Sequence, residues 1–550
     1  MPKSRFYVGV DVGTSSVRAA VVDDQGTVLG SSVKAIRIWN DQPDFYEQSS
    51  ENIWSCIISA VRDVMKECKV DQANIKGIGF DATCSMVVLD ANFQPLSVSP
   101  NGERQQNIIM WMDHRAKKEA EFINSTKHPV LDSVGGVMSL EMQTPKLMWI
   151  KKHLAQTWAE AAHFFDLPDF LTWRATNSLS RSLCSLVCKW SYQADNTGRT
   201  SWDDDFLGKL GLEELKENCY SKLGQVVLAA GCPCGQGLSQ TAADELGLRV
   251  GIPVGTSLID AHAGALACVS CSSSKSQLPD LDQRLVVIAG TSTCHIICSS
   301  CRVSVPGVWG PYFSAMVPGM WVNEGGQSAT GKLIDFVVEG HPAYNTVRSK
   351  AEQKGMHVSD YLNDLLAQLV VKRGCPSIAQ LTQDIHMWPD FHGNRSPVAD
   401  PKLRGMMSGL SLSANDEDLA LLYLATVQAL AYGTRHIISE MERSGHTVSV
   451  VYMCGGLRKN KLYVQTHTDI LGVPVVLPDS EESVLLGAAM LGACASGDFP
   501  NIQAVMAAMG GCGEVIDPDT SVSGYHKRKY EVFLEMLKDQ NKYSDIMASS

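Results

Sequence analysis

Apolar stretches separated by short polar corners predict a β-hairpin at the start of the chain. An apolar stretch begins at Phe6 and runs into Asp11, a Gly-Thr-Ser-Ser corner follows at 13–16, and a second apolar stretch reaches Val22. The residues before Asp11 are typical of strands, and Gly13 suits the tight turn between the two stretches.

The positions after this hairpin predict two further strands and a helix. A polar turn at 23–26 leads into a short third strand, Thr27–Leu29. Apolar residues at helical spacing predict a helix over about Glu51–Lys66, and the run Ile75–Phe80 predicts a strand that ends at Asp81. The first half therefore predicts a three-stranded meander, a helix and a further strand.

The hairpin pattern recurs about half a chain later. Residues 285–298 again consist of an apolar strand, a Gly-Thr-Ser corner and a second apolar strand. A long helix is predicted over about Asp416–Arg443, a strand over Val448–Met453, and a charged amphipathic helix with a frayed end over the last 25 residues. Two hairpins of the same kind indicate two related halves.

Both corners have the chemistry to hold the phosphates of a nucleotide. Their backbone N–H groups and hydroxyls would donate to a polyphosphate, and Asp11 would face the accompanying Mg²⁺. The candidate phosphate-binding residues are Gly13, Thr14 and Ser15 in the first corner and Gly290, Thr291 and Ser292 in the second. An ordinary β-turn with an Asp at its edge is the alternative for the first corner. The sequence lacks a P-loop and a Rossmann glycine motif, which disfavours the other common nucleotide folds.

Composition and charge narrow the class of protein. The 550 residues exceed what one core normally supports, so two domains are expected. Lys and Arg total 47 against 59 Asp and Glu, a net charge of −12 without a basic run, which disfavours nucleic acid or an anionic membrane as partner. The start lacks an apolar signal core and no apolar run is long enough to span a bilayer, so we expect a cytoplasmic protein. The oligomeric state stays open, with a homodimer among the alternatives.

The 17 cysteines are an odd number, and we expect most of them to be small buried hydrophobes in a reducing compartment. Cys268/Cys271 and Cys298/Cys301 have the internal spacing of zinc-ribbon ligand pairs. The 26 residues between the pairs exceed the usual gap, and a Ser/Lys-rich segment at about 271–284 predicts a flexible insertion there. Structural zinc is therefore the weaker interpretation.

Several separated motifs together resemble one protein family. Besides the two hairpins they are Trp111-x-Asp113-x-Arg115, Lys146-Leu147-x-Trp149, the stretch Gly255–Gly264, and Gly455-Gly456 with Asn460. In this order, over roughly the first 500 residues, they resemble the FGGY carbohydrate kinases, whose hairpins are those of the actin, heat-shock-chaperone and sugar-kinase superfamily. The resemblance implies an α/β fold of two ribonuclease-H-like domains around a central cleft. We place an N-terminal domain at 1–257, a C-terminal domain at 258–510, and a C-terminal helix and tail at 511–550.

The resemblance also implies roles in catalysis. Asp260 stands where the family has its general base, which accepts the proton of the attacking sugar hydroxyl; a helix N-cap is the alternative. Gly456 and Asn460 match the adenine-side positions of the family. ATP is the implied co-substrate and Mg²⁺ the implied metal, with Asp11 as its ligand.

The sugar pocket is similar to that of the ribulokinases within this family. Thr83-Cys84-Ser85-Met86-Val87 resembles the segment that marks a D-ribulokinase-type subgroup, with Met in place of Leu. Lys189 and Glu324 stand where ribulokinases offer an amine and a carboxylate to the sugar; solvated surface charges are the alternative for both. The substrate-binding candidates are Thr83, Cys84, Ser85, Trp111 as an aromatic wall, Lys189, Asp260 and Glu324.

These features predict an ATP- and Mg²⁺-dependent kinase for the terminal hydroxyl of a ketopentose, with D-ribulose as the first candidate. Another pentulose or pentitol, namely L-ribulose, xylulose or ribitol, is the alternative that keeps the mechanism. Two alternatives change the class of protein: a chaperone-like or actin-like ATPase that binds protein partners, and a sugar-binding protein that has lost catalysis.

Overall fold

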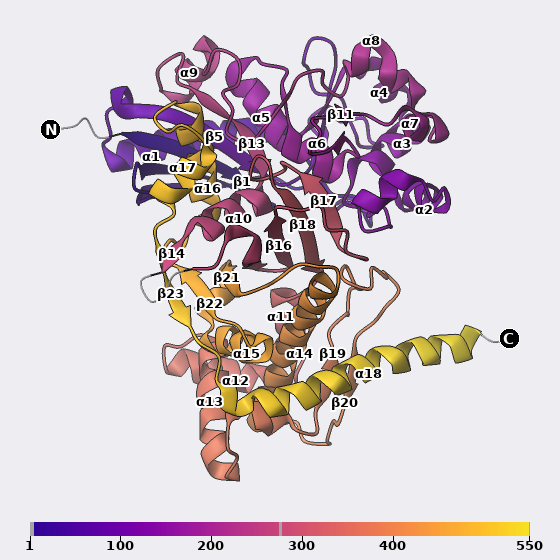
Figure 1. Cartoon of the computed structure of the whole chain (residues 1–550), viewed down its shortest axis with the longest axis vertical. Helices are drawn as coiled ribbons and strands as arrows, with labels where there is room; N and C mark the ends of the chain where they lie inside the picture. Colours follow the sequence, from indigo (N-terminus) through magenta and orange to yellow (C-terminus); the bar gives the residue numbers. More distant parts are fainter. Residues whose placement is uncertain (1–4, 274–277, 549–550) are drawn as a thin grey trace.

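The structure, a computed structural model, describes residues 5–273 and 278–548. It consists of two lobes stacked one above the other, each with a central β-sheet covered by helices (Figure 1). The N-terminal half of the chain forms the upper lobe in this view, and most of the C-terminal half forms the lower lobe. Part of the predicted insertion, residues 274–277, lies outside the described residues.

The first sheet has five strands in the spatial order β13–β5–β1–β2–β3. They are β1 (Phe6–Val12), β2 (Ser16–Asp23), β3 (Val28–Ala35), β5 (Ile75–Ala82) and β13 (Val254–Ile259). Strands β1, β2 and β3 form an antiparallel meander, and β5 and β13 run parallel to β1. The prediction of a third strand at Thr27–Leu29 was too short, because the rest of β3 is an edge strand with alternate residues exposed and therefore lacks an apolar run.

The second sheet repeats this arrangement and adds strands at its edges. Its order is β14–β23–β22–β21–β15–β16–β18–β17. The five shared strands are β15 (Arg284–Ala289), β16 (Thr293–Ser299), β18 (Trp321–Gln327), β21 (Val450–Cys454) and β22 (Val475–Pro478); the added ones are β14 (Ser272–Ser273), β17 (Trp309–Phe313) and β23 (Cys512–Ile516). As in the first sheet, a three-stranded antiparallel meander is followed by two parallel strands. This duplication is the predicted α/β architecture of two related halves.

Helices pack on the two central sheets and around them. In the first half they are α1 (Ser50–Cys68), α2 (Lys117–Ser125), α3 (Gln143–His153), α4 (Ala155–Glu160), α5 (Leu167–Thr176), α6 (Leu183–Lys189), α7 (Asp204–Lys209), α8 (Glu217–Tyr220), α9 (Gln240–Leu246) and α10 (Asp260–Ser270). In the second half they are α11 (Gly331–Glu339), α12 (Tyr344–Gln353), α13 (Val358–Arg373), α14 (Asp416–Arg443), α15 (Lys461–Leu471), α16 (Ser483–Ala495), α17 (Ile502–Met509) and α18 (Ser523–Ala548). The helices predicted at about 51–66 and 416–443 are α1 and α14.

The remaining strands form small sheets outside the two central ones. One has four strands, β4 (Glu47–Gln48), β7 (Ile108–Ile109), β6 (Met86–Leu89) and β8 (His163–Asp166). The others are the pairs β9 (Arg181–Ser182) with β12 (Val227–Leu228), β10 (Gln193–Ala194) with β11 (Thr200–Ser201), and β19 (His386–Trp388) with β20 (Met406–Ser408).

Helix α16 of the second half packs on the sheet of the first half. Figure 1 shows it in the upper lobe beside β1 and β5, and it also packs against α10. Glycines on the strands admit this close approach: a Cβ at Gly9, Gly79 or Gly255 would lie 2.3, 1.9 or 2.3 Å from a backbone oxygen of α16. The lobes are therefore joined by a helix whose backbone rests directly on three strands of the other half.

Replacing Gly79 with Ala is expected to destabilise the protein by about 1–3 kcal/mol, since the added methyl group meets the Ala488 carbonyl and helix or strand must shift. Thermal unfolding followed by circular dichroism would show a lower apparent melting temperature. Gly208→Ala in α7 is the matched control, because a Cβ there has no heavy atom within 4 Å. Equal melting temperatures for the two variants would contradict the close packing of α16.

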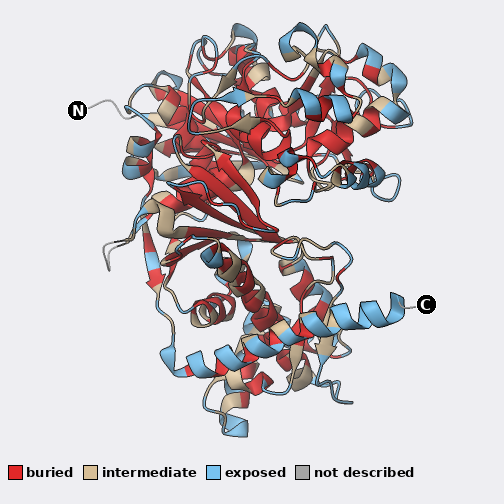
Figure 2. Cartoon of the chain, turned by 45° about the vertical axis from the view of Figure 1, so that its right-hand side comes forward, coloured by how far each residue is buried: buried red, intermediate tan, exposed pale blue. Residues whose placement is uncertain are grey.

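The C-terminal helix α18 crosses the lower lobe and extends past it (Figure 2). Tyr525, Phe533 and Met536 are buried against the lobe, whereas the last turns are exposed. A helix was predicted in this segment; its very end, 549–550, lies outside the described residues.

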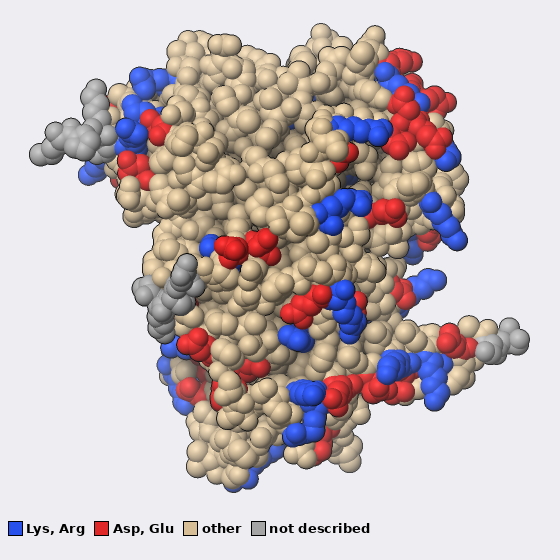
Figure 3. Space-filling model, in the orientation of Figure 1, with Lys and Arg blue, Asp and Glu red and all other residues tan. Residues whose placement is uncertain are grey.

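No helix within 5–273 or 278–548 combines the length and apolarity that crossing a membrane requires. Acidic and basic side chains are intermixed over the face shown in Figure 3.

Candidate active site

The two predicted phosphate corners occupy equivalent places in the two sheets. The first joins β1 to β2, where the Gly13 N–H donates to the Ser16 carbonyl at 3.0 Å. The second joins β15 to β16, where the Gly290 N–H donates to the Ser292 carbonyl at 2.9 Å. All six corner residues are at least partly exposed, unlike the strands that carry them. The two glycine N–H groups are used within the turns, which leaves the N–H groups and hydroxyls of Thr14, Ser15, Thr291 and Ser292 for a ligand.

Two carboxylates stand side by side where β1 and β5 end. Asp11 and Asp81 are register partners on these parallel strands, and both are buried. Neither carboxylate oxygen of Asp81 receives a hydrogen bond from a donor. Burial, together with the neighbouring Asp11 carboxylate, raises the pKa of Asp81 well above its usual value. The pair is short of positive charge, and this property fits a site for a hard divalent cation.

Arg18 provides part of the missing positive charge. It is the cross-strand partner of Asp11 in the hairpin, and its Nε donates to Asp11 Oδ2 at 2.7 Å. Its second bond, from Nη1 to Glu482 Oε2 at 2.8 Å, reaches the residue just before α16. Arg18 therefore connects the first corner to the second half of the chain. Neither Arg18 nor Asp81 was predicted from the sequence.

Asp260 is the first residue of α10 and belongs to the same group of acids. Ile259 takes the N-cap position, and the Asp260 carboxylate accepts a hydrogen bond from the Ala261 N–H at 2.7 Å, so the predicted alternative of a simple N-cap does not describe it. The residue is still partly exposed to solvent. The loss of solvent around its carboxyl group is the larger cause, and the negative charge of Asp11 the second, that raises the pKa of Asp260 to about 7. A carboxyl with this pKa can take up or release a proton near neutral pH.

Lys189 and Glu324 approach each other from different halves of the chain. Lys189 ends α6 and Glu324 lies in β18, and each residue is 3 % exposed. The alternative that they are solvated surface charges is therefore wrong. Burial alone would raise the pKa of Glu324, but Lys189 and then Arg395 outweigh it and lower the pKa to about 2. Glu324 is thus ionised at neutral pH between two cations.

Arg395 completes this charged group and was not predicted from the sequence. It donates from Nη2 to the Glu324 carboxylate, and its guanidinium lies 4.1 Å from the ring centre of Trp309. The Lys189 ammonium lies 4.2 Å from the centre of the same ring. An aromatic face and fixed donors and acceptors are what a polyol site needs. Arg395 belongs to a loop between β19 and β20 that has no local sequence signal.

The segment 83–85 joins the sugar candidates to the first phosphate corner through Trp111. The Trp111 N–H donates to Ser85 Oγ at 3.2 Å, and its indole Nε1 donates to Thr14 Oγ1 at 3.1 Å. Thr83 Oγ1 lies 3.4 Å from Ser85 Oγ, and Cys84 is buried. Trp111 thus touches a predicted sugar residue and a predicted phosphate residue at once.

Asn460 has a structural function in addition to its predicted one. It is the N-cap of α15, where its Oδ1 accepts from the N–H groups of Leu462 and Tyr463 at 3.1 and 3.3 Å. Its Nδ2 donates to the Tyr423 hydroxyl at 2.6 Å. Gly456 has open space where a side chain would stand. The assignment of Gly456 and Asn460 to the adenine stays a prediction.

Two other features lie apart from these residues. The four cysteines of the zinc-ribbon alternative do not form a metal-binding group. Among the described residues, the one group of His, Cys, Asp and Glu side chains close enough to share an ion contains none of them. A cavity of about 520 Å³ lies at α2 and α3 and is lined by none of the candidate site residues.

Known proteins match the chain over almost its full length. The N-terminal domain of the FGGY family of carbohydrate kinases matches residues 6–267, and the C-terminal domain matches residues 285–496. The FGGY carbohydrate kinase domain-containing protein of Xenopus laevis is 52 % identical over 547 residues, which cover 98 % of each chain. A D-ribulokinase of Saccharomyces cerevisiae is 41 % identical over 524 residues, 90 % of this chain and 73 % of that protein.

The fold also matches solved structures. The crystal structure of xylulose kinase from Rhodospirillum rubrum superposes with a TM-score of 0.78 at 19 % identity and covers 98 % of this chain and 99 % of that one. Together with the two family domains, this match confirms the predicted two-domain α/β fold. The chain belongs to the FGGY family of carbohydrate kinases and is a sugar kinase, with ATP as the co-substrate that this family implies.

Proposed function

We propose that the protein transfers the terminal phosphoryl group of ATP to the terminal hydroxyl of D-ribulose, giving D-ribulose 5-phosphate and ADP. The observation that carries the proposal is the burial of Lys189 and Glu324, the two charged residues that the ribulokinase resemblance assigns to the sugar. The 41 % identity to a yeast D-ribulokinase supports the same substrate. The match to carbohydrate kinases over both halves favours this function over a chaperone-like ATPase.

Asp260 is the general base in this proposal. It accepts the proton of the sugar hydroxyl as that oxygen bonds to the γ-phosphorus of ATP, and the bond between this phosphorus and the bridging oxygen of ADP breaks. The corners at 13–15 and 290–292 donate N–H and hydroxyl groups to the phosphates. Lys189, Glu324 and Arg395 orient the sugar so that its hydroxyl lies in line with the phosphoryl group.

Asp11 and Asp81 would hold the Mg²⁺ that accompanies ATP. Their adjacent buried carboxylates, one of them without any hydrogen-bond donor, are ligands suited to this ion. When bound, the ion supplies neutralisation of the charge that develops on the phosphates. Arg18 holds Asp11 in place from the neighbouring strand.

A panel of substrates tests the proposal. ADP release by the purified protein with Mg-ATP is measured on D-ribulose, L-ribulose, xylulose, ribitol and glycerol. The proposal expects the highest kcat/KM on D-ribulose, because a misplaced hydroxyl leaves buried polar groups without partners and costs about 1–3 kcal/mol per contact. A higher kcat/KM on another sugar would change the proposed substrate and leave the proposed mechanism as it is. Hydrolysis of ATP that no sugar stimulates would contradict the proposed function.

The rate is expected to fall as the pH drops through about 7. A general base acts only when deprotonated, and the pKa of Asp260 is raised to about 7 by burial and by Asp11. The value of kcat/KM for the sugar should therefore be highest above this pKa and fall about tenfold per pH unit below it. A pH profile of kcat/KM measures this limb. The residual rate of Asp260→Asn should lack it, and an identical limb in that variant would contradict the assignment of the base.

A further inference from the structure

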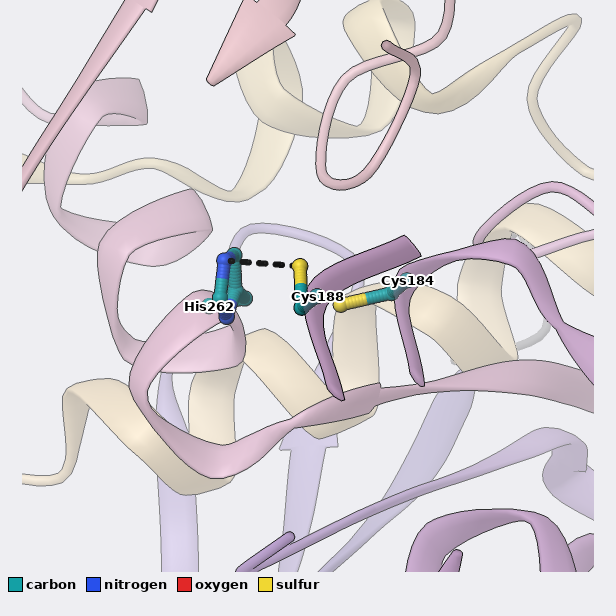
Figure 4. Close-up of side chains that lie close together, drawn as sticks. All are labelled: Cys184, Cys188 and His262. Atoms are coloured by element: carbon teal, nitrogen blue, oxygen red, sulfur yellow. Dashed lines mark hydrogen bonds between the residues drawn. The ribbon is translucent and has the colours of Figure 1, made fainter. Parts of the chain in front are cut away.

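Two thiols and an imidazole lie together beside the sugar candidates and have no part in the proposed reaction. Cys184 and Cys188 are one helical turn apart on α6, and His262 projects from the first turn of α10 (Figure 4). One ligand atom from each of the three lies within 4.8 Å of the other two, and all three side chains are buried. Cys188 Sγ is 3.7 Å from His262 Nε2. We call these three residues the thiol–imidazole cluster.

The donors of this cluster suit a zinc ion. Zn²⁺ prefers thiolate and imidazole ligands in a tetrahedron, with Zn–S and Zn–N bonds of about 2.3 and 2.0 Å, so that its ligand atoms are separated by roughly 3.5–3.8 Å. The ligand atoms of the cluster all lie within 4.8 Å of one another, close to that spacing. His262 Nδ1 is buried without a hydrogen-bond partner, so no neighbour commits the imidazole to another interaction through that atom.

The cluster is joined to the sugar candidates on two sides. Lys189 directly follows Cys188 along α6, and Glu324 Oε2 lies 3.9 Å from His262 Nε2, the same nitrogen that faces Cys188. Glu324 lies outside the 4.8 Å grouping of the three cluster residues, so its carboxylate would become a fourth ligand for zinc by moving toward Cys188. An ion held by the cluster would therefore compete with Lys189 and Arg395 for Glu324.

We propose that the thiol–imidazole cluster binds a zinc ion with Glu324 as the fourth ligand, and that the bound ion inhibits the kinase by withdrawing Glu324 from the sugar. The inhibition rests on the proposed function, because it requires Glu324 to bind the sugar; the binding of the ion does not. Both thiols lose their protons when the ion binds, so binding releases protons.

The site itself is tested without substrate. The full chain, freed of metal and kept in reducing buffer, is titrated with Zn²⁺ by calorimetry and with Cd²⁺ by absorption spectroscopy, which detects cadmium–thiolate bonds. One ion per chain and a thiolate band are expected. Cys184→Ser and Cys184→Ala should weaken binding by at least about 100-fold, the upper end of what loss of an outer-shell partner costs a metal site. Cys219→Ser, at an exposed cysteine, is the matched control and should bind like the original protein.

The results separate the site from the proposed function. If the original protein gives no thiolate band, the proposed site is wrong, whatever the variants do. The site is also wrong if both Cys184 variants retain the band. With Mg-ATP in excess, Zn²⁺ should inhibit sugar phosphorylation competitively with the sugar, and each Cys184 variant should lose this inhibition relative to its own zinc-free rate. A rate unchanged by the bound ion overturns the inhibition. A protein that binds the ion but phosphorylates no sugar of the panel overturns the proposed function and leaves the zinc site standing.

Discussion

Asp260→Asn is expected to lower kcat by about 10²–10⁴-fold, the contribution typical of a positioned general base. The amide has the shape of the carboxylate, and its oxygen can keep the hydrogen bond from the Ala261 N–H, so α10 should begin as before. What the substitution removes is the ability to accept a proton. It also removes a negative charge near Asp11, so ATP binding should not weaken. ADP release with sugar and Mg-ATP measures kcat, and titration with ATP measures binding.

Asp63→Asn is the matched control for this experiment. Asp63 lies on α1, pairs with Lys34, and is half exposed, so the same chemical change there should leave turnover unchanged. A folded Asp260→Asn protein with near-normal turnover would contradict the role of Asp260. Loss of ATP binding in this variant would show instead that Asp260 helps to hold the nucleotide.

The sequence predicted those parts of the fold and site that depend on local patterns. Each phosphate corner is a strand, a glycine turn and a second strand within about a dozen residues, so the pattern of side chains contains the whole feature. The same is true of α1 and α14, whose apolar positions recur at helical spacing. The position of Asp260 directly after a strand was predicted from its motif, and its role as the base was taken from the family resemblance and stays a prediction.

Features formed by distant segments could not be predicted in the same way. Asp81 ends an apolar strand as Asp11 does, and this similarity was the available signal, but only the register of β5 beside β1 shows that the two acids meet. Arg395 lies in a loop, and its partner Glu324 precedes it by 71 residues. The placement of α16 on the first sheet depends on glycines in three separate strands, each unremarkable by itself.

Glu324→Gln is expected to lower kcat/KM for the sugar by about 10²–10³-fold. Glu324 is the anion between Lys189 and Arg395, and its pKa of about 2 means that it carries its charge at every pH at which the enzyme is assayed. The amide leaves the part-buried Arg395 without its ion-pair partner and the buried Lys189 without a nearby anion, and breaking a buried ion pair typically costs about 3–5 kcal/mol. Part of this cost will appear as a lower melting temperature and part as weaker sugar binding.

The division between these two effects shows whether Glu324 binds the sugar. If it does, the KM for the sugar rises steeply, while the KM for ATP stays within a few-fold of normal, because the phosphate corners are unchanged. Glu352→Gln on α12, which removes the charge of an exposed pair with Arg348, controls for the charge alone and should alter neither. If Glu324→Gln melts at a lower temperature but keeps the normal KM for the sugar, the role of Glu324 is only to join the two halves of the chain. A rise in the sugar KM together with the lower melting temperature would place Glu324 on the substrate, which is the result that the paired cations and the shared Trp309 ring lead us to expect.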